Sequence, residues 1–573
     1  MATQRVVIDP ITRIEGHLRI ELETDGGRIT NAWASATQYR GIETILQGHD
    51  PRDAWALAQR ICGVCTGVHA IASIRAVEDA LKYPVPKSAE LIRDLVMGMG
   101  IVQDHVMHFY HLHALDWVDV KSALSADPQA TARLAATISP WPNNSSTWFR
   151  EVQDRVAKSV AGGQLGIFAG GYWGHPAYRL PPEVNLLALA HYLEALQWQR
   201  EIIRLHAIFG GKNPHPNFLV GGMACAINLD NQLTINAVRL DELSGYISKA
   251  RRFVEEVYYP DVLAIGGFYK EYAAIGVSSP TLMATGESGF SCPGSPRGGD
   301  VQAGVLLDGN YKSLQPFDPL KISEFVTSAW YSYPEGDRTG RQPWKGETIP
   351  KYTGPRPPYQ RLSDKEKYTW VKAPRYDGRA VQVGPNARLL VAYAQGHAAT
   401  VRLVDEALGK LGAGSESLNS TLGRTLCRAL ESVLLARRLE EWFGALQERI
   451  KSGDTATFNP DKWDPKSWPK SAQGVGFTEA ARGTLSHWVE IENGRIARYQ
   501  CVVPSTWNSS GRDAEGQLGP FEHALAGGGH HPLQDPERPL EVLRTVHSFD
   551  PCQSCAVHVF DPDGRGIGEV NVS

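Results

Sequence analysis

Two Cys-x-x-Cys pairs stand near opposite ends of this chain, Cys62 with Cys65 and Cys552 with Cys555. Thiolates are soft ligands that favour nickel, iron, zinc and copper(I) over cations that prefer oxygen. Structural zinc sites usually take both pairs from a short stretch of sequence, whereas most of the chain separates these two. A metal held by all four sulfurs would therefore tie both ends of the fold together at its centre.

The composition argues against two other classes of protein. With 62 acidic and 58 basic residues the formal net charge is −4, so no basic field is available to hold nucleic acid. Eight cysteines in 573 residues are too few for a disulfide scaffold. We interpret the four single cysteines as small buried side chains: Cys225, Cys292, Cys427 and Cys501.

The sequence shows no targeting or membrane segment. Its first residues lack the apolar core of a signal peptide, and no stretch reaches the roughly 18 apolar residues of a membrane span. Taken alone, these features predict a cytosolic protein.

The first part of the chain predicts a β-hairpin followed by a helix. Apolar and polar residues alternate over 18–23, and an Asp-Gly-Gly turn leads into a second strand over 29–34. Asp50, followed by proline, is a typical helix N-cap. We expect that helix to lead to the first cysteine pair and to end near Gly63.

Longer helices are predicted where apolar residues recur at helical spacing, and these helices should pack as a central bundle. Residues 276–375 are rich in glycine and proline, which predicts irregular loops with short strands. No internal repeat is present. The predicted class is α+β, predominantly helical, with an N-terminal β-hairpin and irregular insertions. The predicted long helices are 88–124, 146–161, 182–209, 239–258, 385–411 and 417–452.

Short motifs around and between the cysteine pairs occur in the same order in one known family. The first pair stands in Arg-Ile-Cys-Gly-Val-Cys-Thr-Gly-Val-His and the second in Asp-Pro-Cys-Gln-Ser-Cys-Ala-Val-His. With these motifs the chain resembles the large subunit of nickel-iron hydrogenases over essentially its whole length. The other matching segments are 13–17, 40–43, 210–216, 481–483 and 503–508.

The resemblance implies a metal centre with two metals. Cys62, Cys65, Cys552 and Cys555 would hold nickel, and Cys65 and Cys555 would also bridge to an iron that carries carbon monoxide and cyanide. Four thiolates give nickel the electron density for redox change, and shared sulfurs keep two metals close. For the four sulfurs alone, the alternative is a structural zinc site.

The resemblance also implies a magnesium ion held by Glu43, His558 and the backbone carbonyl of Cys501. A carboxylate and a carbonyl suit Mg²⁺, whereas an imidazole is less usual. From the residues alone, His558 could instead be a fifth ligand of the cysteine site, and Glu43 a solvated charge.

Glu15 matches a glutamate that takes protons from a nickel-bound sulfur. Burial near thiolates should raise its pKa, which suits a proton relay. The alternative is a salt bridge with Arg13 or Arg19.

Arg482 matches an arginine whose guanidinium lies over the open face of the metals, where Asp104 and Asp550 would fix its plane. A structural Arg-Asp cluster is the alternative. The family commonly has proline before this arginine, and this chain has Ala481, which affects local rigidity.

Three more polar residues match positions around the family's metals. His69 would donate a hydrogen bond to a bridging sulfur, and Ser505 to an iron-bound cyanide. His215 would lie at the partner interface near its first iron-sulfur cluster. Each of them could also be an ordinary polar group with its hydrogen bonds satisfied.

Four histidines share one predicted helix: His105, His108, His111 and His113. Their spacing could bind a metal, but we interpret them as packing and interface residues.

The resemblance implies reversible oxidation of H2 to protons and electrons, in a hydrogen-uptake role. The chain has no further cysteine cluster to carry electrons, which predicts an iron-sulfur small subunit as partner. Residues 109–117 resemble the membrane-bound respiratory group, so a membrane cytochrome b is a further expected partner. Alternatives within the family are a hydrogen sensor and a cytosolic cofactor-reducing enzyme; outside it, a non-enzymatic metal scaffold or maturation partner with a zinc site. A related subunit of respiratory complex I lacks these cysteines, so their presence argues against that subunit.

We expect residues 1–558 to form one domain and residues 559–573 a maturation tail. Family tails are cut after the histidine that matches His558 by an endopeptidase, once nickel chaperones have delivered the metal. A peptide continuing past His558 should hold the second cysteine pair away from the first. A permanent surface strand is the alternative. Export with a small subunit that carries the signal would place the mature enzyme at the periplasmic face of the membrane, after a cytoplasmic precursor stage.

Overall fold

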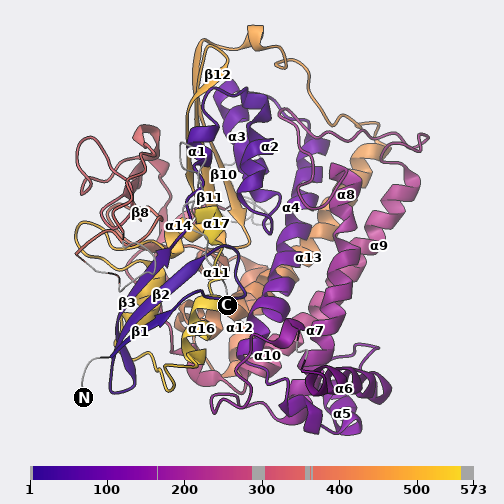
Figure 1. Ribbon diagram of the computed structural model, residues 1–573. Helices are drawn as coiled ribbons and strands as arrows, with labels where there is room; N and C mark the ends of the chain where they lie inside the picture. Colours follow the sequence, from indigo (N-terminus) through magenta and orange to yellow (C-terminus); the bar gives the residue numbers. More distant parts are fainter. Residues whose placement is uncertain (1–3, 164–165, 287–302, 355–361, 363–364, 557–573) are drawn as a thin grey trace.

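The computed structural model describes residues 4–163, 166–286, 303–354, 362 and 365–556. Long helices stand together on one side of the molecule, and the β-sheets lie on the other side (Figure 1). This arrangement confirms the predicted α+β class. Among the described residues, no helix is both long and apolar enough to span a bilayer.

The centre of the helical half is α13 (Thr421–Lys451), which packs against α4 (Lys87–Met107) and α9 (Ala237–Phe253). Helix α7 (Pro182–Ile202) contacts both α4 and α9. The first half of α13 is almost entirely buried, because helices surround it on several sides (Figure 1). Compared with the predicted helix 417–452, α13 begins a few residues late and ends close to the predicted residue.

Two of the predicted long helices are interrupted. The segment 182–209 breaks after α7, where α8 (Arg204–Gly210) begins. The segment 385–411 divides into α11 (Pro385–Ala394) and α12 (Ala398–Leu411), because Gly396 between them has a φ of +73°. In contrast, α6 (Ser146–Ala161) has the predicted bounds at both ends.

Two more predicted helices change their winding. After α9 the chain forms a π-helical turn (Val254–Tyr258) and continues as α10 (Tyr259–Gly266). Pro260 explains this change, since it has no N–H for the α-helical ladder. Helix α4 likewise passes into a π-helical turn (His108–His113) and ends well before residue 124.

The N-terminal sheet contains the predicted hairpin. Strands β2 (Leu18–Asp25) and β3 (Arg28–Ala36) are antiparallel and turn at two glycines with positive φ. Strand β1 (Gln4–Ile8), which the sequence did not predict, pairs with β2 and gives the order β1-β2-β3.

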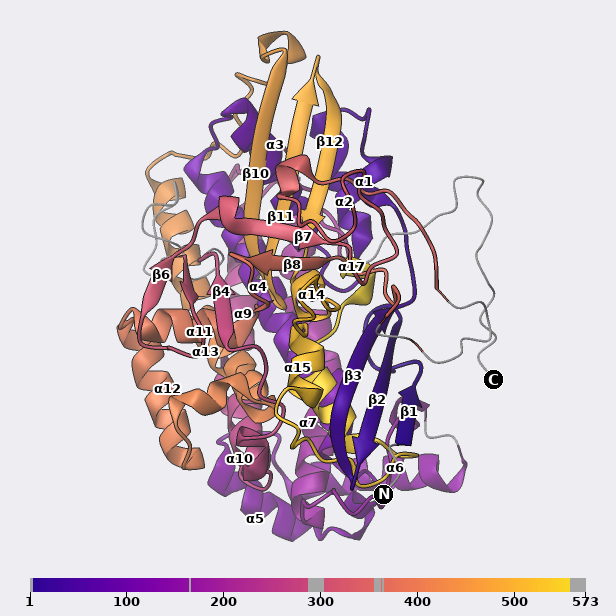
Figure 2. The same cartoon turned by 90° about the vertical axis from the view of Figure 1, so that its left-hand side faces the viewer.

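A second antiparallel sheet, β10 (Ser471–Ala480), β11 (Gly483–Glu492) and β12 (Arg495–Val502), was also not predicted. Helix α3 (Val68–Leu81) lies against it, behind the sheet in Figure 2. The contact is close: a Cβ atom on Gly476 of β10 would lie 2.1 Å from a carbonyl oxygen of α3. Glycine at this position therefore allows the helix to approach the strand.

Within the described part of 276–375, only short elements occur, as predicted. One sheet has the order β6-β5-β4-β9, and β7 pairs with β8. These strands are β4 (Thr281–Ala284), β5 (Gly304–Leu306), β6 (Leu314–Pro316), β7 (Ile322–Phe325), β8 (Ala373–Tyr376) and β9 (Val381–Gln382). The remaining α-helices are α1 (Ile42–Ile45), α2 (Ala54–Ala58), α5 (Pro128–Ile138), α14 (Pro504–Asn508), α15 (Pro520–Ala526), α16 (Leu540–His547) and α17 (Gln553–Ala556).

The largest hydrophobic core joins the helical half to the β10–β12 sheet, and Cys62, Cys65 and Cys552 are part of it. A smaller core packs the β1–β3 sheet against α15 and α16. The segments that carry Cys62, Cys65 and Cys552 therefore meet in the core that joins the helices to the β10–β12 sheet.

Candidate metal centre

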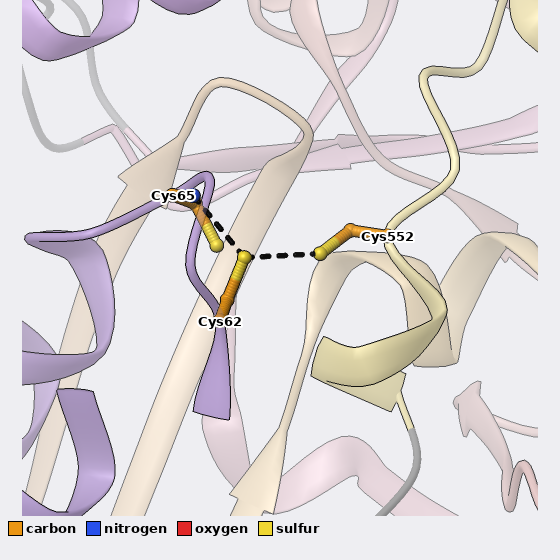
Figure 3. A group of neighbouring side chains, drawn as sticks. All are labelled: Cys62, Cys65 and Cys552. Atoms are coloured by element: carbon orange, nitrogen blue, oxygen red, sulfur yellow. Dashed lines mark hydrogen bonds between the residues drawn. The ribbon is translucent and has the colours of Figure 1, made fainter. Parts of the chain in front are cut away.

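Three of the four predicted cysteine ligands converge in the core. The sulfur atoms of Cys62, Cys65 and Cys552 all lie within 4.8 Å of one another, and all three residues are buried (Figure 3). Cys62 Sγ lies 3.4 Å from Cys552 Sγ. A disulfide would need ~2.05 Å, whereas two thiolates on one tetrahedral metal with bonds of about 2.3 Å lie ~3.7 Å apart. The geometry fits a shared metal. The side chain of Cys555 lies outside the described residues.

The first cysteine pair follows a short helical segment, as predicted. Asp50 is the N-cap of this segment, because its side chain accepts a hydrogen bond from the amide of Arg52. The last 3-10 turn of the segment ends at Ile61. Cys62 then turns to extended backbone, and the amides of Val64 and Cys65 donate to its sulfur at 3.3 and 3.1 Å. Such N–H donors favour the thiolate form.

The second cysteine pair is held by the N-terminal loop. The backbone of Glu15 forms an isolated parallel β-bridge with that of Cys552. The Glu15 carbonyl accepts a hydrogen bond from the Gln553 amide at 2.7 Å. A Cβ atom on Gly16, whose φ is +80°, would lie 2.5 Å from the amide nitrogen of Ser554. Glycine is therefore required for this close approach.

The Glu15 carboxylate faces the cysteine cluster. Its Oε2 lies 3.8 Å from Cys552 Sγ and accepts a hydrogen bond from the Ser554 amide at 3.3 Å. Burial, and then the negative charge of Cys62, raise the pKa of Glu15 above its usual value. This direction agrees with the expectation for a proton relay.

The predicted alternatives for Glu15 are wrong. Arg13 pairs with Asp116 at 2.5 Å, and Arg19 pairs with Glu21 at 2.5 Å. Both arginines are therefore engaged by other carboxylates.

Arg482 lies in the turn between β10 and β11, with the two aspartates where they were expected. Its Nη2 donates to Asp550 Oδ1 and its Nε to the Asp550 carbonyl, each at 3.0 Å, and Nη1 lies 3.6 Å from Asp104 Oδ2. Burial alone would lower the pKa of Arg482, but the charges of Asp550, Cys552 and Asp104 raise it well above its usual range. Arg482 is therefore a permanent cation beside the cysteines.

Arg482, Cys65 and Cys552 line one small cavity. Apolar side chains, including Leu485 and Val503, line most of its wall. Arg482 Nη1 is buried and has no hydrogen-bond partner among the described residues. A buried donor without an acceptor is costly, so a bound group that brings an acceptor to this atom would be favoured.

Ser505 lines the same cavity. Its hydroxyl accepts a hydrogen bond from the Cys552 amide at 3.0 Å, which leaves its O–H to donate. His69 also lines the cavity, and its Nδ1 lies 3.1 Å from Nε2 of His487 on β11. Both residues therefore line the cavity beside the cysteines, and their roles as donors to metal-bound groups stay predictions.

Glu43 is buried, so the solvated-charge alternative is wrong. Its Oε1 accepts a hydrogen bond from the Cys501 amide at 2.8 Å, and its Oε2 lies 3.6 Å from Lys372 Nζ and accepts from Thr348. Glu324 is 1% exposed and lies 3.8 Å from the same ammonium. Two carboxylates thus share one ammonium. The third expected magnesium ligand, His558, lies outside the described residues.

His215 is half-buried and has a φ of +61°. Its side chain forms a hydrogen bond with the backbone of Thr66, and burial lowers the pKa of the imidazole. The residue therefore lies beside the first cysteine pair, and its interface role stays a prediction.

Each histidine of the four-histidine run has a partner within the chain, which confirms the packing interpretation. The pairs are His105 with Glu431 (2.6 Å), His108 with the His547 carbonyl (2.6 Å), His111 with the Tyr192 carbonyl (3.3 Å) and His113 with Asp116 (3.2 Å). Their role at an interface stays a prediction.

Sequence analysis missed four charged or polar residues that surround the site: Lys372, Glu324, Arg388 and His487. Lys372 and Glu324 come from the irregular segment, where no periodic pattern exists to place a side chain. Arg388 and His487 belong to elements whose packing only the three-dimensional structure shows.

Comparison with known proteins gives a consistent result. The family model described as nickel-dependent hydrogenase matches residues 40–558, and a model described as HoxL-like matches residues 5–39. The chain is 50% identical to the uptake hydrogenase large subunit of Bradyrhizobium diazoefficiens, covering 99% of this chain and 97% of that protein. It is 48% identical to the hydrogenase-1 large chain of Escherichia coli K12, covering 100% and 98%. The Ni-Fe-Se hydrogenase structure from D. vulgaris Hildenborough aligns with a TM-score of 0.75 at 32% identity, covering 97% of this chain and 100% of that one.

Proposed function

This chain belongs to the nickel-dependent hydrogenases, and we infer that it is the catalytic large subunit of an enzyme that oxidises H2 in hydrogen uptake. The observation that carries this conclusion is the convergence of Cys62, Cys65 and Cys552 from both ends of a chain that matches the family almost throughout. Nickel and iron, when bound there, supply the redox and Lewis-acid chemistry that splits H2. The sensor and cofactor-reducing alternatives receive no support from the relatives named above.

For the metal ligands, we propose the complete set of four cysteines. Cys62, Cys65, Cys552 and Cys555 would hold nickel, with Cys65 and Cys555 shared with iron. Carbon monoxide or cyanide on that iron would point toward the small cavity beside Arg482 and Ser505, since its wall is mostly apolar and both residues offer donors.

Glu15 is proposed to take the proton from the Cys552 sulfur. Support comes from the 3.8 Å separation and from the raised pKa, which lets the carboxyl hold a proton nearer neutral pH.

A magnesium ion is proposed at Glu43, the Cys501 carbonyl and His558. Support comes from the buried Glu43 carboxylate, which accepts a hydrogen bond from the Cys501 amide and therefore lies beside the backbone of the second proposed ligand.

The partners are proposed from the chemistry and the family. Electrons would leave through an iron-sulfur small subunit that binds near His215, and then pass to a membrane cytochrome b. This assembly would place the mature enzyme at the periplasmic face of the membrane.

Arg482→Lys is expected to slow turnover by roughly 10²-fold while nickel and iron content stays normal, because a point charge replaces a planar fork beside the reacting site. Hydrogen-dependent dye reduction, normalised to nickel, measures the effect. An unchanged rate would reduce Arg482 to a structural ion pair.

In the full-length chain Cys552 already lies beside Cys62 and Cys65, so the expectation that the tail holds this cysteine away is wrong. The proposed cleavage still predicts that active enzyme ends at His558, because a peptide that continues past this residue would keep Cys555 from completing the site. The maturation endopeptidase and nickel chaperones would act before closure. Intact-mass analysis of the active large subunit should therefore show residues 559–573 missing. A fully active species that ends at Ser573 would refute the cleavage.

The function itself is tested with the purified complex of large and small subunits under H2. We expect hydrogen-dependent reduction of a viologen or a higher-potential dye. A nickel-loaded complex that reduces neither dye would contradict the assignment as a catalytic uptake enzyme.

A further inference from the structure

Arg482 depends on the backbone that presents it. It stands in the tight turn Ala481-Arg482 between β10 and β11, followed by Gly483 with a φ of +130°. Ala481 lacks the ring that fixes φ in proline. The position of the turn therefore depends on the hydrogen bonds made to its carbonyl groups.

One buried side chain makes those bonds, Arg388 of α11. Its Nη1 donates to the Ala480 carbonyl at 2.9 Å and its Nη2 to the Ala481 carbonyl at 3.3 Å. We propose that Arg388 is a positioning residue that fixes Arg482 at the metal site. The inference rests on the role proposed above for Arg482.

The remaining donors of Arg388 make it rigid. Nε donates to Glu431 Oε1 at 2.5 Å, Nη2 to Glu431 Oε2 at 2.6 Å, and Nη1 to Glu479 Oε2 at 2.8 Å. All five N–H groups of the guanidinium therefore have an acceptor. The side chain cannot turn without leaving buried carboxylates uncompensated.

The acceptors are themselves fixed. Glu479 Oε1 accepts hydrogen bonds from the Thr285 amide and from Thr484 Oγ1, each at 2.7 Å. Thr484 follows the turn on β11, so Glu479 connects the strands on both sides of Arg482. The network that holds Arg388 thus encloses the turn.

The same network reaches the carboxylate that faces Arg482. Glu431 Oε2 lies 2.6 Å from His105 Nε2, and His105 follows Asp104 on α4. Asp104 forms an ion pair with Arg482, with its Oδ2 3.6 Å from Nη1 and beyond hydrogen-bond distance. Arg388 therefore sets the turn that carries the cation and, through Glu431, the helix that carries its anion.

The test is Arg388→Lys in the complete enzyme. Lysine keeps the charge but cannot hold two carbonyls and two carboxylates in one plane. We expect turnover to fall by about 10-fold at normal nickel content, because small misplacements near reacting groups have large effects on rate.

Arg93→Lys is the matched control. Arg93 is also fully buried, forms two hydrogen bonds with Glu78 at 3.0 and 2.6 Å, and donates to the carbonyls of Leu219 and Gly222. The Arg93→Lys substitution removes a comparable guanidinium fork at a position that makes no hydrogen bond to the Arg482 turn. Its turnover should stay within about twofold of wild type. An equal loss in both variants would overturn the inference.

A double-mutant cycle separates positioning from general damage. In an Arg482→Lys background, adding Arg388→Lys should change the rate by less than about twofold, since the group it positions is already gone. If the rate losses of the two single variants multiply in the double variant, the inference is overturned but the role of Arg482 stays intact. A wild-type rate for Arg482→Lys alone would instead refute that role, and with it the inference.

A readout other than activity is the infrared spectrum of the iron-bound ligands. Their bands should shift in Arg388→Lys in the same direction as in Arg482→Lys, and stay in place in Arg93→Lys. Bands that do not move would contradict positioning. If Arg388→Lys does not fold, Glu479→Gln replaces it in all three measurements with the same expected pattern, because it removes the carboxylate that holds Nη1.

Discussion

Cys62→Ala is expected to abolish both metal incorporation and hydrogen oxidation. The Cys62 sulfur lies 3.4 Å from that of Cys552 and accepts two backbone N–H bonds, so it is a fixed ligand position at the centre of the cluster. Without it the metal loses a ligand that solvent cannot replace in a buried site. Nickel measured by mass spectrometry in the purified variant should be close to zero.

The matched control is Cys427→Ala. Cys427 is equally buried but lies on α13, away from the cysteine cluster. This variant should keep its nickel and most of its activity, with only the modest stability loss of a small cavity. Normal nickel in Cys62→Ala would contradict the assignment of the cysteine ligands.

Glu15→Gln should keep both metals and lose turnover by about 10²- to 10⁴-fold, the range in which positioned acid–base groups contribute. The amide can still accept the hydrogen bond from Ser554 at Oε, so the loop should keep its position. It cannot carry a proton away from the Cys552 sulfur. Exchange of hydrogen isotopes between H2 and solvent should fall together with turnover.

Glu21→Gln provides the control for loss of a buried carboxylate. Glu21 lies on β2 in ion pairs with Arg5 and Arg19, away from the cysteines. Its replacement should affect stability more than rate. If isotope exchange survives in Glu15→Gln, a different group must take the proton.

Local sequence signals predicted the parts of the fold that depend on neighbouring residues. The hairpin over β2 and β3, both bounds of α6, and the helix begun by Asp50 follow from alternation, periodicity and capping, and all are confirmed. The β10–β12 sheet was missed, although its strands are long. Gly474 and Gly476 weaken the strand pattern of β10, and only the close approach of α3 explains them.

The candidate site divides in the same way. Cysteine spacing and family motifs placed Cys62, Cys65, Cys552, Glu15 and Arg482, and the structure brings them together. The groups that hold these residues were not predicted. Arg388 contacts the Arg482 turn across nearly a hundred residues of sequence, and no local pattern encodes such a contact.

The metal content of the purified, active complex tests the central claim most directly, since a nickel site and a structural zinc site would use the same cysteines. We expect close to one nickel per large subunit and far less than one zinc. Zinc at one per large subunit, with nickel absent, would contradict the account.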